Sequence, residues 1–539
     1  MNILLLEPSF KNKYPPLSLM KIAAFHHNRG DEVYFRKGAS KDLPADIIWD
    51  RIYISTIFTF TWPETRGIID FALKQTVLPQ NIYVGGGVAT LETDVIREYA
   101  PDINIISGLL NRPGLLNLPG DETIDTITPD YSILEQIEYK YAMKDAYFLY
   151  STRGCGMGCS FCAVDRLEPQ YFPYISITEQ VQEIEKQTGA KRHLMLMDNN
   201  VLKSDQLKQI VDDICNLGFQ KGATYTNSKT GKTVRRTVDF NQGLDANFLT
   251  FEKAQQLARI AIDPVRIAFD HIGQKERYLK AIRTCFDAGL RKFSNYLLYN
   301  SDNASWKGIS YGADDPASLY ERLEINVNLQ QELQAELDKN NINEKVAFFS
   351  FPMRYIPLNH LKRGYIGTNW NPKYLRSVQA ILTPTQGKGV ASPTFFKTAF
   401  GENTSDFITI LEMPERLIMR RGTPKRRKAE DDISFQNRQR LHEKNIQLIN
   451  SWKTLRQKAQ NLGLWNNFFN KFIAPNHFQH EDFRKINQDL LKILYLFYWI
   501  TPTRLKKELP KLEPNDANLI MTFIEDPNHN LLHLLNTWK

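Results

Sequence analysis

Short apolar runs alternate with amphipathic stretches at the start of the chain. The runs ILLLEPSF, DEVYF, IYIST and NIYVGGG are typical of buried strands, whereas LSLMKIAAFHHNRG and ETRGIIDFALKQ repeat apolar residues at helical spacing. Strands and helices that alternate in this way predict a parallel sheet covered by helices. We therefore expect an α/β fold with a parallel sheet for residues 1–125.

A second strand–helix series follows a linker. The regular pattern lapses between about Asn111 and Glu138 into Pro-, Asp- and Thr-rich sequence, and we place the linker at 126–145. Six strand–helix units within 146–360 predict a partial (β/α)6 barrel, in which functional residues gather at the carboxyl ends of the strands. The expected strands are Ala146–Tyr150, His193–Met197, Val238–Asn241, Val265–Phe269, Lys292–Leu298 and Lys345–Phe349. The expected helices are Thr178–Gln187, Leu207–Leu217, Thr250–Ile260, Lys275–Ala288 and Pro316–Leu337.

This rhythm is lost in residues 361–539. The long stretches ISFQNRQRLHEKNIQLINSWKTLRQKAQNLGLW and FRKINQDLLKILYLFYWI have apolar residues at helical period. We expect a mainly helical C-terminal region that takes part in substrate recognition. Because domains usually contain about 100 to 200 residues, a chain of 539 residues agrees with a division into two or three domains.

The composition is typical of a folded protein outside the membrane. Residues are 42% hydrophobic and 24% charged, and no unbroken apolar run in the sequence reaches about 18 residues. The N-terminus MNILLLEPSF has no basic residue ahead of its apolar run, so it predicts a first strand rather than a signal peptide. We therefore expect a cytoplasmic protein with no membrane partner. The formal charge of +8 allows a polyanionic partner without requiring one.

Three of the five cysteines, Cys155, Cys159 and Cys162, lie within eight positions of each other. Five thiols are too few for a disulfide framework, and this clustering indicates a metal site. Glycines alternate with the cysteines in STRGCGMGCSFCAVD and let the loop turn tightly enough for the sulfurs to converge. A four-iron cubane normally takes four thiolates, so three leave one iron open. We expect these three residues to be the metal ligands.

The remaining cysteines and the nearby histidines give the alternatives. A zinc site needs four ligands, and His193 or His271 would have to be brought near the three thiols by folding. Cys215 and Cys285 stand alone in amphipathic helical patterns, where ordinary buried thiols are expected.

The spacing C-x3-C-x2-C, with the aromatic Phe161 before the third cysteine, resembles the signature of the radical S-adenosylmethionine (SAM) superfamily. Its place after the first strand of the expected barrel agrees with that resemblance. The resemblance implies a 4Fe-4S cluster whose open iron binds the amino and carboxylate groups of SAM. It further implies that one electron from the cluster cleaves SAM to methionine and a 5′-deoxyadenosyl radical, and that an electron donor such as flavodoxin or ferredoxin supplies the electron.

The same resemblance gives roles to polar residues at the ends of the expected strands. LMLMDNNVL ends the second strand where the family usually has a turn that contacts the methionine amine of SAM. VDFNQGLDA and RIAFDH end the third and fourth strands with residues that would face SAM or, in the third, the substrate. A strand-end cap or a turn residue is the alternative for each. The cofactor-binding candidates are Phe161, Asp198, Asn199, Asn241, Gln242, Asp270 and Asn300, with Asp245 and Arg354 as further strand-end residues.

Residues 1–125 resemble the Rossmann-like, cobalamin-binding-type domain that precedes the barrel in one large branch of the superfamily. The glycine triplet 85–87 follows a strand, where a ligand often lies against the backbone, and a tight turn is the alternative. His27 and Gly30 match the tail of that branch's histidine-ligand motif, but Phe25 replaces its Asp, and Gly30 suits a helix C-cap. The sequence therefore leaves open whether cobalamin binds.

The distribution of cysteines narrows the reaction. The methylthiotransferase relatives carry three further cysteines for a second cluster in their N-terminal domain, whereas residues 1–154 contain no cysteine. The C-terminal half also lacks the cysteine-rich extension of peptide-modifying relatives. We therefore expect one cluster and no sulfur insertion by that route.

Two basic segments leave a nucleic-acid partner open, because such clusters can neutralise phosphates. A solvated surface is the alternative, since an acidic run follows the first segment and the second is expected to be an exposed hairpin. The basic residues are Arg416, Arg420, Arg421, Lys425, Arg426, Arg427 and Lys428 in the first segment, and Lys229, Lys232, Arg235 and Arg236 in the hairpin.

The sequence therefore supports a radical SAM enzyme that acts on an unidentified substrate, either by cobalamin-dependent methyl transfer or by hydrogen abstraction. The alternatives are an iron–sulfur nucleic-acid-binding protein without turnover and a radical SAM enzyme that modifies nucleic acid.

Overall fold

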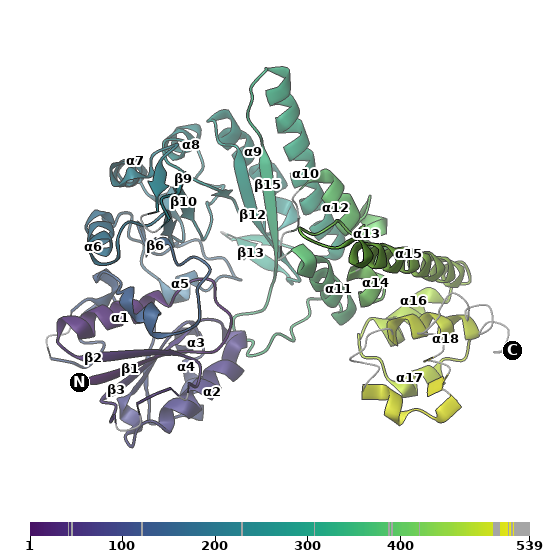
Figure 1. Cartoon of the computed structure of the whole chain (residues 1–539), viewed down its shortest axis with the longest axis horizontal. Coiled ribbons are helices and arrows are strands. Elements are labelled where there is room, and N and C mark those ends of the chain that lie inside the picture. The colour runs from purple at the N-terminus through teal and green to yellow at the C-terminus, as the bar shows by residue number, and fades with distance from the viewer. Residues whose placement is uncertain are drawn as a thin grey trace.

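Three regions follow one another along the chain: an N-terminal sheet flanked by helices, a central region of parallel strands and helices, and a group of C-terminal helices (Figure 1). The computed structural model describes residues 1–539 except 41, 45–46, 120–121, 228–229, 307, 386, 388, 390–391, 420, 500–506, 516, 519–520 and 522–539. Among the residues described, no helix is both long and apolar enough to cross a membrane.

The N-terminal sheet is parallel throughout, in the order β2-β1-β3-β4-β5, which confirms the expected α/β pattern. Side chains on β1 point alternately to opposite faces, so Leu5 belongs to the core shared with the central region and Leu4 and Leu6 to a separate core. Because β2 and β3 lie on opposite sides of β1, the strand order reverses there, and ligands of open α/β sheets bind at such a point. The strands are β1 (Asn2–Glu7), β2 (Glu32–Lys37), β3 (Arg51–Thr56), β4 (Ile82–Gly86) and β5 (Asn104–Ile106). The helices are α1 (Leu17–Asn28), α2 (Trp62–Leu73), α3 (Gly87–Leu91) and α4 (Thr93–Tyr99).

Two glycines of the triplet, Gly86 and Gly87, lie too close to the end of β3 and the residue after it to accept side chains. Gly86 has a φ of +96°, and a Cβ there would collide with the carbonyl oxygen of Thr56. A Cβ on Gly87 would collide with the carbonyl oxygen of Ile57. Gly30, by contrast, has open space around it and a φ of +77° just after α1, as expected of a helix C-cap.

The central region contains two parallel sheets, β6-β7-β10 and β11-β12-β15. Two isolated parallel bridges, Val238 to Ile262 and Leu244 to Ile267, join the edges of these sheets, so the strands follow one another in chain order. The strands are β6 (Ala146–Leu149), β7 (His193–Leu196), β10 (Thr237–Phe240), β11 (Val265–Arg266), β12 (Lys292–Tyr299) and β15 (Ala347–Arg354). The helices are α5 (Val164–Leu167), α6 (Thr178–Thr188), α7 (Leu207–Ile214), α8 (Phe251–Leu257), α9 (Lys275–Asp287) and α10 (Pro316–Lys339).

All six expected strands and five expected helices of this region are present, with changed ends. The fourth strand shortens to Val265–Arg266, whereas the sixth extends to Arg354 because it pairs with β12 along its whole length. The helix that begins at Leu207 ends at Ile214, where the chain passes into a π-helical turn, Cys215–Phe219. Gly218 in this turn has a φ of +79°, which an α-helix cannot contain.

Two antiparallel hairpins are inserted in the central region. The expected basic hairpin is confirmed and consists of β8 (Thr224–Thr226) and β9 (Thr233–Arg235), with Lys229 outside the described residues. The second hairpin, β13 (Ala304–Trp306) and β14 (Ile309–Tyr311), follows β12 and was not expected from the sequence.

The segment 126–145 packs between the N-terminal and central regions. The hydroxyl of Tyr131 accepts a hydrogen bond from the N–H of Phe148 and donates one to the carbonyl of Ala146 on β6. The side chain of Gln136 exchanges hydrogen bonds with the backbone of β2 at Val33 and Phe35. One core extends from the N-terminal sheet through the central strands to the C-terminal helices.

The C-terminal region is helical, as expected (Figure 1). Several helices begin with a capping side chain followed by proline, as at Asn371–Pro372 and Ser392–Pro393, where the cap accepts a backbone N–H. The stretch 483–500 is predicted as one helix, but α17 ends at Lys485 and the next helix begins at Asp489. Ile486, between the two helices, is buried in the core. Residue 500 lies outside the described residues. The helices are α11 (Pro372–Leu382), α12 (Pro393–Phe400), α13 (Thr404–Glu412), α14 (Glu415–Met419), α15 (Asp432–Asn461), α16 (Trp465–Phe468), α17 (His480–Lys485) and α18 (Asp489–Leu496).

Candidate functional site

The loop that follows β6 carries the three clustered cysteines. Gly154, Gly156 and Gly158 all have positive φ values, which only glycine adopts readily. A Cβ on Gly154 would collide with the carbonyl oxygen of Gln170. The carboxylate of Asp165, on α5, accepts the N–H groups of Gly156 (3.1 Å) and Gly158 (2.7 Å). The loop is therefore held in one shape by the short helix that follows the third cysteine.

All three thiols of this loop are half-buried. Burial raises the pKa of Cys159 to about 12, with the neighbouring sulfurs contributing, and burial raises the pKa of Cys162 to about 11. Thiolates are the form that binds metal, and a bound cation deprotonates its thiol ligands. Among the described residues, no three His, Cys, Asp or Glu side chains stand close enough to hold a single metal ion. The thiols of a cubane bind different irons and are spaced more widely than the ligands of one ion.

A cavity of about 140 Å³ opens beside the thiols, at the carboxyl ends of the central strands. Four of the expected cofactor contacts line it: Phe161, Asn199, Gln242 and Asp270. Residues missed in the sequence line it too. They are Asn200, Asn247, Gln274, Arg277, Tyr278 and Trp306.

Asn200 connects the cavity wall to the cysteine loop. Its Nδ2 donates to the Sγ of Cys155 (3.5 Å) and to the Oδ2 of Asp245 (3.2 Å). Its Oδ1 is buried and has no hydrogen-bond partner among the described residues. An orphaned acceptor in a polar cavity fits a ligand that brings a donor, such as an amino group. Its position directly after Asp198 and Asn199 was the sequence signal that could have identified it.

Asp270 provides a half-buried carboxyl group in the same cavity. Burial raises its pKa to about 6, although the Arg322 guanidinium opposes the shift. Arg322 does not bond the carboxylate: its Nη1 donates to the backbone carbonyls of Phe269 (3.1 Å), Asp270 (2.7 Å) and Leu298 (2.8 Å). The backbone behind Asp270 is therefore fixed by a side chain from α10.

The hairpin β13–β14 covers the cysteine loop. Ser160 donates its N–H to the carbonyl of Ser305 (3.1 Å), and Ser305 donates its N–H to the hydroxyl of Ser160 (3.0 Å). The ring of Phe161 lies 4.8 Å from that of Trp306, which in turn packs edge-on against Tyr311. Aromatic side chains from a segment some 145 residues away thus shield this side of the loop from water.

Replacing Trp306 with Ala is expected to leave an assembled cluster open to solvent and oxygen. Because the apolar shell of a metal site controls solvent access, we expect loss of the cluster in air to be on the order of tenfold faster. The decay of the cluster's visible absorbance measures this rate. Ile309→Ala, an exposed change on the same hairpin, is the matched control and should not alter it. Equal decay in Trp306→Ala and the unaltered protein would show that the hairpin does not shield the loop.

The structure directs three expected contacts elsewhere. The Oδ1 of Asn241 accepts a hydrogen bond from the hydroxyl of Tyr14 (2.9 Å), which comes from the N-terminal region. Asn300 is fully buried and donates to the carbonyls of Tyr355 (3.1 Å) and Tyr365 (3.3 Å). These bonds stabilise its φ of +71°, and Asn300 is not part of the cavity wall, so its role as a cofactor contact stays a prediction.

Arg354, the further candidate at the end of β15, also lies outside the cavity wall. Its Nη2 donates to the carbonyl of Tyr365 (2.6 Å), so it belongs to the same structural network as Asn300.

Asp198, the third expected contact that the structure places outside the cavity wall, lies beneath the cysteine loop. Its Oδ1 accepts the hydroxyls of Ser151 (2.9 Å) and Thr152 (2.7 Å) and the N–H of Thr152, while its buried Oδ2 has no partner among the described residues. Burial raises the pKa of Asp198 to about 6 against the effect of these bonds. The side chain fixes the start of the loop and is not part of the cavity wall, and its role as a cofactor contact stays a prediction.

The raised pKa of Asp198 predicts how pH affects stability. A carboxyl group that binds its proton more tightly in the folded state contributes stability that is fully present below its unfolded pKa of about 4 and is lost as the pH rises through about 6. We expect the melting temperature of cofactor-free Asp198→Asn, relative to that of the unaltered protein, to rise between about pH 4 and pH 7, because the amide cannot lose a proton. The exposed Asp205→Asn is the control. An unchanged pH response in Asp198→Asn would contradict the shift.

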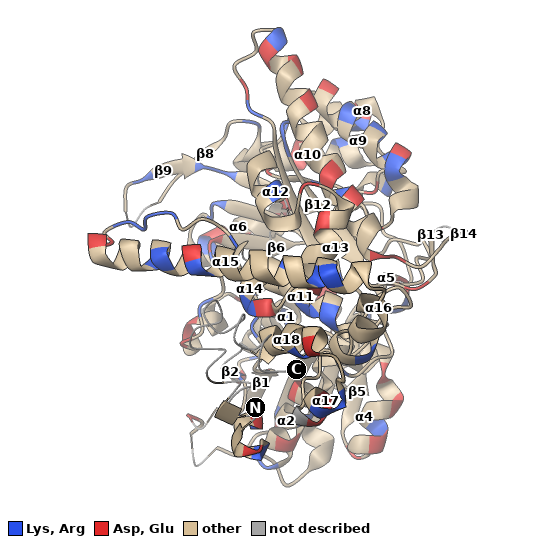
Figure 2. Ribbon diagram, turned by 90° about the vertical axis from the view of Figure 1, so that its right-hand side faces the viewer, with Lys and Arg blue, Asp and Glu red and all other residues tan. Residues whose placement is uncertain are grey.

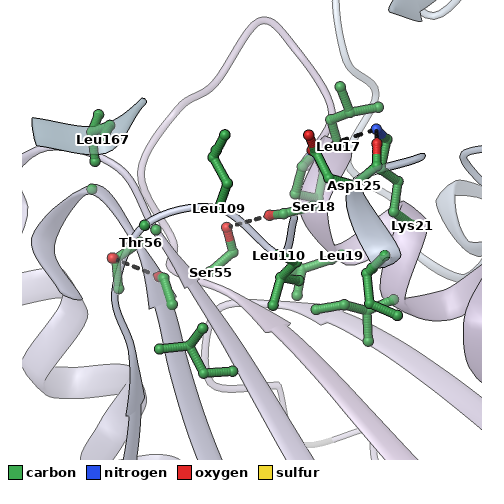
Figure 3. A pocket seen from close by; sticks show the side chains of 18 of the residues that line it. Leu17, Ser18, Leu19, Lys21, Ser55, Thr56, Leu109, Leu110, Asp125 and Leu167 are labelled. Atoms are coloured by element: carbon green, nitrogen blue, oxygen red, sulfur yellow. Dashed lines mark hydrogen bonds and ion pairs between the residues drawn. The ribbon is translucent and has the colours of Figure 1, made fainter. Parts of the chain in front are cut away.

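A second, larger cavity of about 370 Å³ lies between the N-terminal sheet and the central region. Its floor is the carboxyl edge of the sheet, where Ser55 and Thr56 end β3 (Figure 3). Gly85 and Gly86 at the end of β4 and Gly87 at the start of α3 also line it. Ser18 and Ser55 share a hydrogen bond (3.3 Å), and the Thr56 hydroxyl donates to the carbonyl of Gly85 (2.8 Å). Much of the remaining wall is apolar, with Leu17, Leu109, Leu110 and Leu167 among its residues.

No protein-family model matches the chain. No curated protein matches it either. Among solved structures, it is similar to the radical S-adenosylmethionine methyltransferase TsrM from Kitasatospora setae with cobalamin and a [4Fe-4S] cluster bound: 15% identity, 62% of this chain, 73% of that chain and a TM-score of 0.41. The same enzyme with tryptophan and the SAM analogue aza-SAM bound is 13% identical. The match covers 77% of this chain and 84% of that chain, with a TM-score of 0.43. The apo form of OxsB, a cobalamin-dependent S-adenosylmethionine radical enzyme, is 14% identical. The match covers 100% of this chain and 83% of that chain, with a TM-score of 0.43. Such identities and TM-scores are too low to assign a function.

Proposed function

We propose that the chain is a radical SAM enzyme that binds a 4Fe-4S cluster on Cys155, Cys159 and Cys162. The observation that carries the proposal is the position of the three thiols, on one fixed loop beside a polar cavity at the strand ends. Three thiolates leave one iron of a cubane without a protein ligand. The orphaned Oδ1 of Asn200 in the cavity wall fits the same proposal, because SAM carries an amino group that would supply a donor.

The chain's own residues would bind SAM and exclude water. When bound, the cluster supplies the electron that cleaves SAM to methionine and a 5′-deoxyadenosyl radical. Asn199, Gln242 and Asp270 offer polar contacts to SAM from the cavity wall. Phe161 and Trp306 pack together over the loop and limit the entry of water. An external electron donor such as flavodoxin or ferredoxin completes the system, which we place in the cytoplasm.

The central region would form a partial (β/α)6 barrel within 146–360. The parallel strands follow each other in chain order, and the bridges between β10 and the chain around β11 link the two sheets edge to edge. We further propose that 1–125 and 361–539 act as a cofactor-binding and a substrate-recognition domain, joined through 126–145 and the shared core.

We further propose that the N-terminal cavity binds cobalamin, which favours methyl transfer over hydrogen abstraction alone. The glycines at 86 and 87 leave no space for side chains and bring bare backbone to the cavity floor. Its apolar walls and strand-end hydroxyls suit a large, flat ligand with polar edges. When bound, cobalamin supplies a carrier for a methyl group. The residues that would hold it include Ser55, Thr56 and Lys21.

Binding of nucleic acid stays a prediction, and the structure shows competing ion pairs in the first basic segment. Arg426 pairs with Asp432, and Arg438 pairs with Glu430. Arg421 is largely enclosed and donates to the carbonyl of Ala399 (2.6 Å), and burial lowers its pKa to about 10. Arg420 lies outside the described residues. Along α15 the charged residues are mostly basic (Figure 2). They are Arg438, Arg440, Lys444, Lys453, Arg456 and Lys458, against Asp432 and Glu443. A gel-shift titration with RNA and DNA at two salt concentrations would test this partner.

One experiment tests the proposed function directly. The protein is reconstituted anaerobically with iron and sulfide and given SAM and a reductant, with and without cobalamin, and the products are identified by mass spectrometry. We expect 5′-deoxyadenosine, together with S-adenosylhomocysteine that depends on cobalamin. 5′-Deoxyadenosine alone would indicate hydrogen abstraction without methyl transfer. Neither product, from protein whose cluster content has been verified, would refute SAM chemistry.

A further inference from the structure

One carboxylate, Glu168, lines the cavity beside the N-terminal sheet and bonds a residue that lines the cavity beside the thiols. It is 8% exposed, and its hydrogen bonds are 2.8–2.9 Å long. Its Oε1 accepts from Nη1 of Arg153 (2.8 Å). Its Oε2 accepts both the N–H of Gly154 (2.8 Å) and Nδ2 of Asn199 (2.9 Å). The side chain of Glu168 therefore holds three groups: the start of the cysteine loop, the buried Arg153, and Asn199. Asn199 belongs to the wall of the cavity beside the thiols, called the cluster cavity below.

On the N-terminal side, the contacts continue from Arg153 to the first helix. Nε of Arg153 donates to Oδ2 of Asp125 (3.1 Å), and its Nη2 forms an ion pair with Oδ1. Lys21 on α1 donates to the carbonyl of Asp125 and lies 3.7 Å from its carboxylate. Glu168 and these three side chains all line the N-terminal cavity. Figure 3 shows Lys21 and Asp125 close to each other there. Burial lowers the pKa of Lys21 to about 8.

On the other side, the contacts end at the cluster cavity. Asn199 lines that cavity, and Gly154 directly precedes the first cysteine. The helix α5 reinforces this connection, because Arg166 donates to the carbonyl of Leu91 on α3 (2.7 Å) while Asp165 holds the cysteine loop. An unbroken series of charge-assisted hydrogen bonds, buried at Arg153 and Glu168 and partly buried at Asp125 and Asn199, therefore runs from α1 to the cluster cavity.

We infer that Glu168 is a positioning residue that couples the occupancy of the two cavities. The inference rests on the proposed function, with SAM in the cluster cavity and cobalamin in the N-terminal cavity. Hydrogen bonds to charged groups are stronger than those between neutral groups, so Arg153 cannot move toward a ligand without straining the bonds of Glu168 to Gly154 and Asn199. A ligand that orders Lys21, Asp125 and Arg153 also orders Asn199 for SAM, and the coupling must be reciprocal.

The test measures binding rather than turnover, with the reconstituted protein. S-Adenosylhomocysteine, which cannot be cleaved to the radical, and hydroxocobalamin are the probes. In the unaltered protein we expect hydroxocobalamin to tighten S-adenosylhomocysteine binding by about fivefold or more, with the same factor in the reverse titration. In Glu168→Gln, which keeps the shape but removes the charge, we expect a factor near one. Glu179→Gln makes the same chemical change at an exposed position in the first turn of α6 and should keep the full factor.

The outcomes separate this inference from the function on which it rests. Failure of the unaltered protein to bind either probe would refute the proposed function. Binding of both probes with a factor of one, or an undiminished factor in Glu168→Gln, would overturn the coupling and leave the function standing. If Glu168→Gln fails to assemble a cluster, Asn199→Ala replaces it, because that change removes the last bond of the series. It also removes a contact to SAM, but that loss weakens S-adenosylhomocysteine binding equally with and without hydroxocobalamin and therefore cancels from the factor. A factor near one in Asn199→Ala supports the coupling, and an unchanged factor overturns it.

Discussion

Replacing Cys159 with Ala is expected to abolish the cluster. Two thiolates cannot hold a four-iron cubane in place of three, and no other cysteine of the sequence lies in the loop. After anaerobic reconstitution, we expect the brown colour to be lost, together with the bound iron and sulfide. Formation of 5′-deoxyadenosine from SAM should cease as well.

Cys215→Ala is the matched control for this loss. Cys215 is half-buried, and its Sγ lies 3.9 Å from the carbonyl of Arg259, away from the cysteine loop. The variant should therefore retain full iron and sulfide. A cluster fully retained in Cys159→Ala would refute the ligand assignment, and a cluster lost in both variants would point to a general failure to fold.

Replacing Arg322 with Met is expected to destabilise the central region by about 3–5 kcal/mol, because it leaves a buried carboxylate without its partner. Arg322 and Asp314 form an ion pair in which both side chains are 0% exposed. The guanidinium also satisfies the carbonyls of Phe269, Asp270 and Leu298, which would lose their donor. The midpoint of thermal unfolding, measured by circular dichroism, should fall by several degrees.

Arg283→Met, on α9, is the comparison that isolates burial. Arg283 pairs with Glu336, also on α10, but the two side chains are 45% and 36% exposed. Exposed pairs contribute about 0–1 kcal/mol, so this variant should melt close to the unaltered protein. Equal melting temperatures for Arg322→Met and Arg283→Met would contradict the importance of the buried pair.

The cysteine loop could be predicted because its information is local. Cys155, Cys159 and Cys162 lie on one turn whose glycines set its shape, and no distant segment is needed to bring the thiols together. The alternation of strands and helices was equally readable, since the period of apolar residues is a property of each segment. Segment ends were less readable: β15 extends to Arg354 only because β12 lies beside it.

The polar strand ends show what remained undetermined. Sequence placed Asp198, Asn241 and Asn300 at strand ends, but each side chain finds its partners among other polar groups. Asn241, for example, bonds Tyr14, which lies 227 residues away. A polar residue at a strand end can satisfy its hydrogen bonds from ligand or from protein, and only the folded neighbours decide which.

By itself, the sequence determined the chemistry of the cysteine loop: its three thiols, their order, and the glycines that let them converge. Only the tertiary structure decided what surrounds them. Trp306 reaches Phe161 from a hairpin far along the chain, and Glu168 connects two cavities built from segments far apart in sequence. The spacing of the metal ligands is a property of one loop. Shielding of that loop and coupling of the two cavities depend on contacts between distant elements, which only folding brings together.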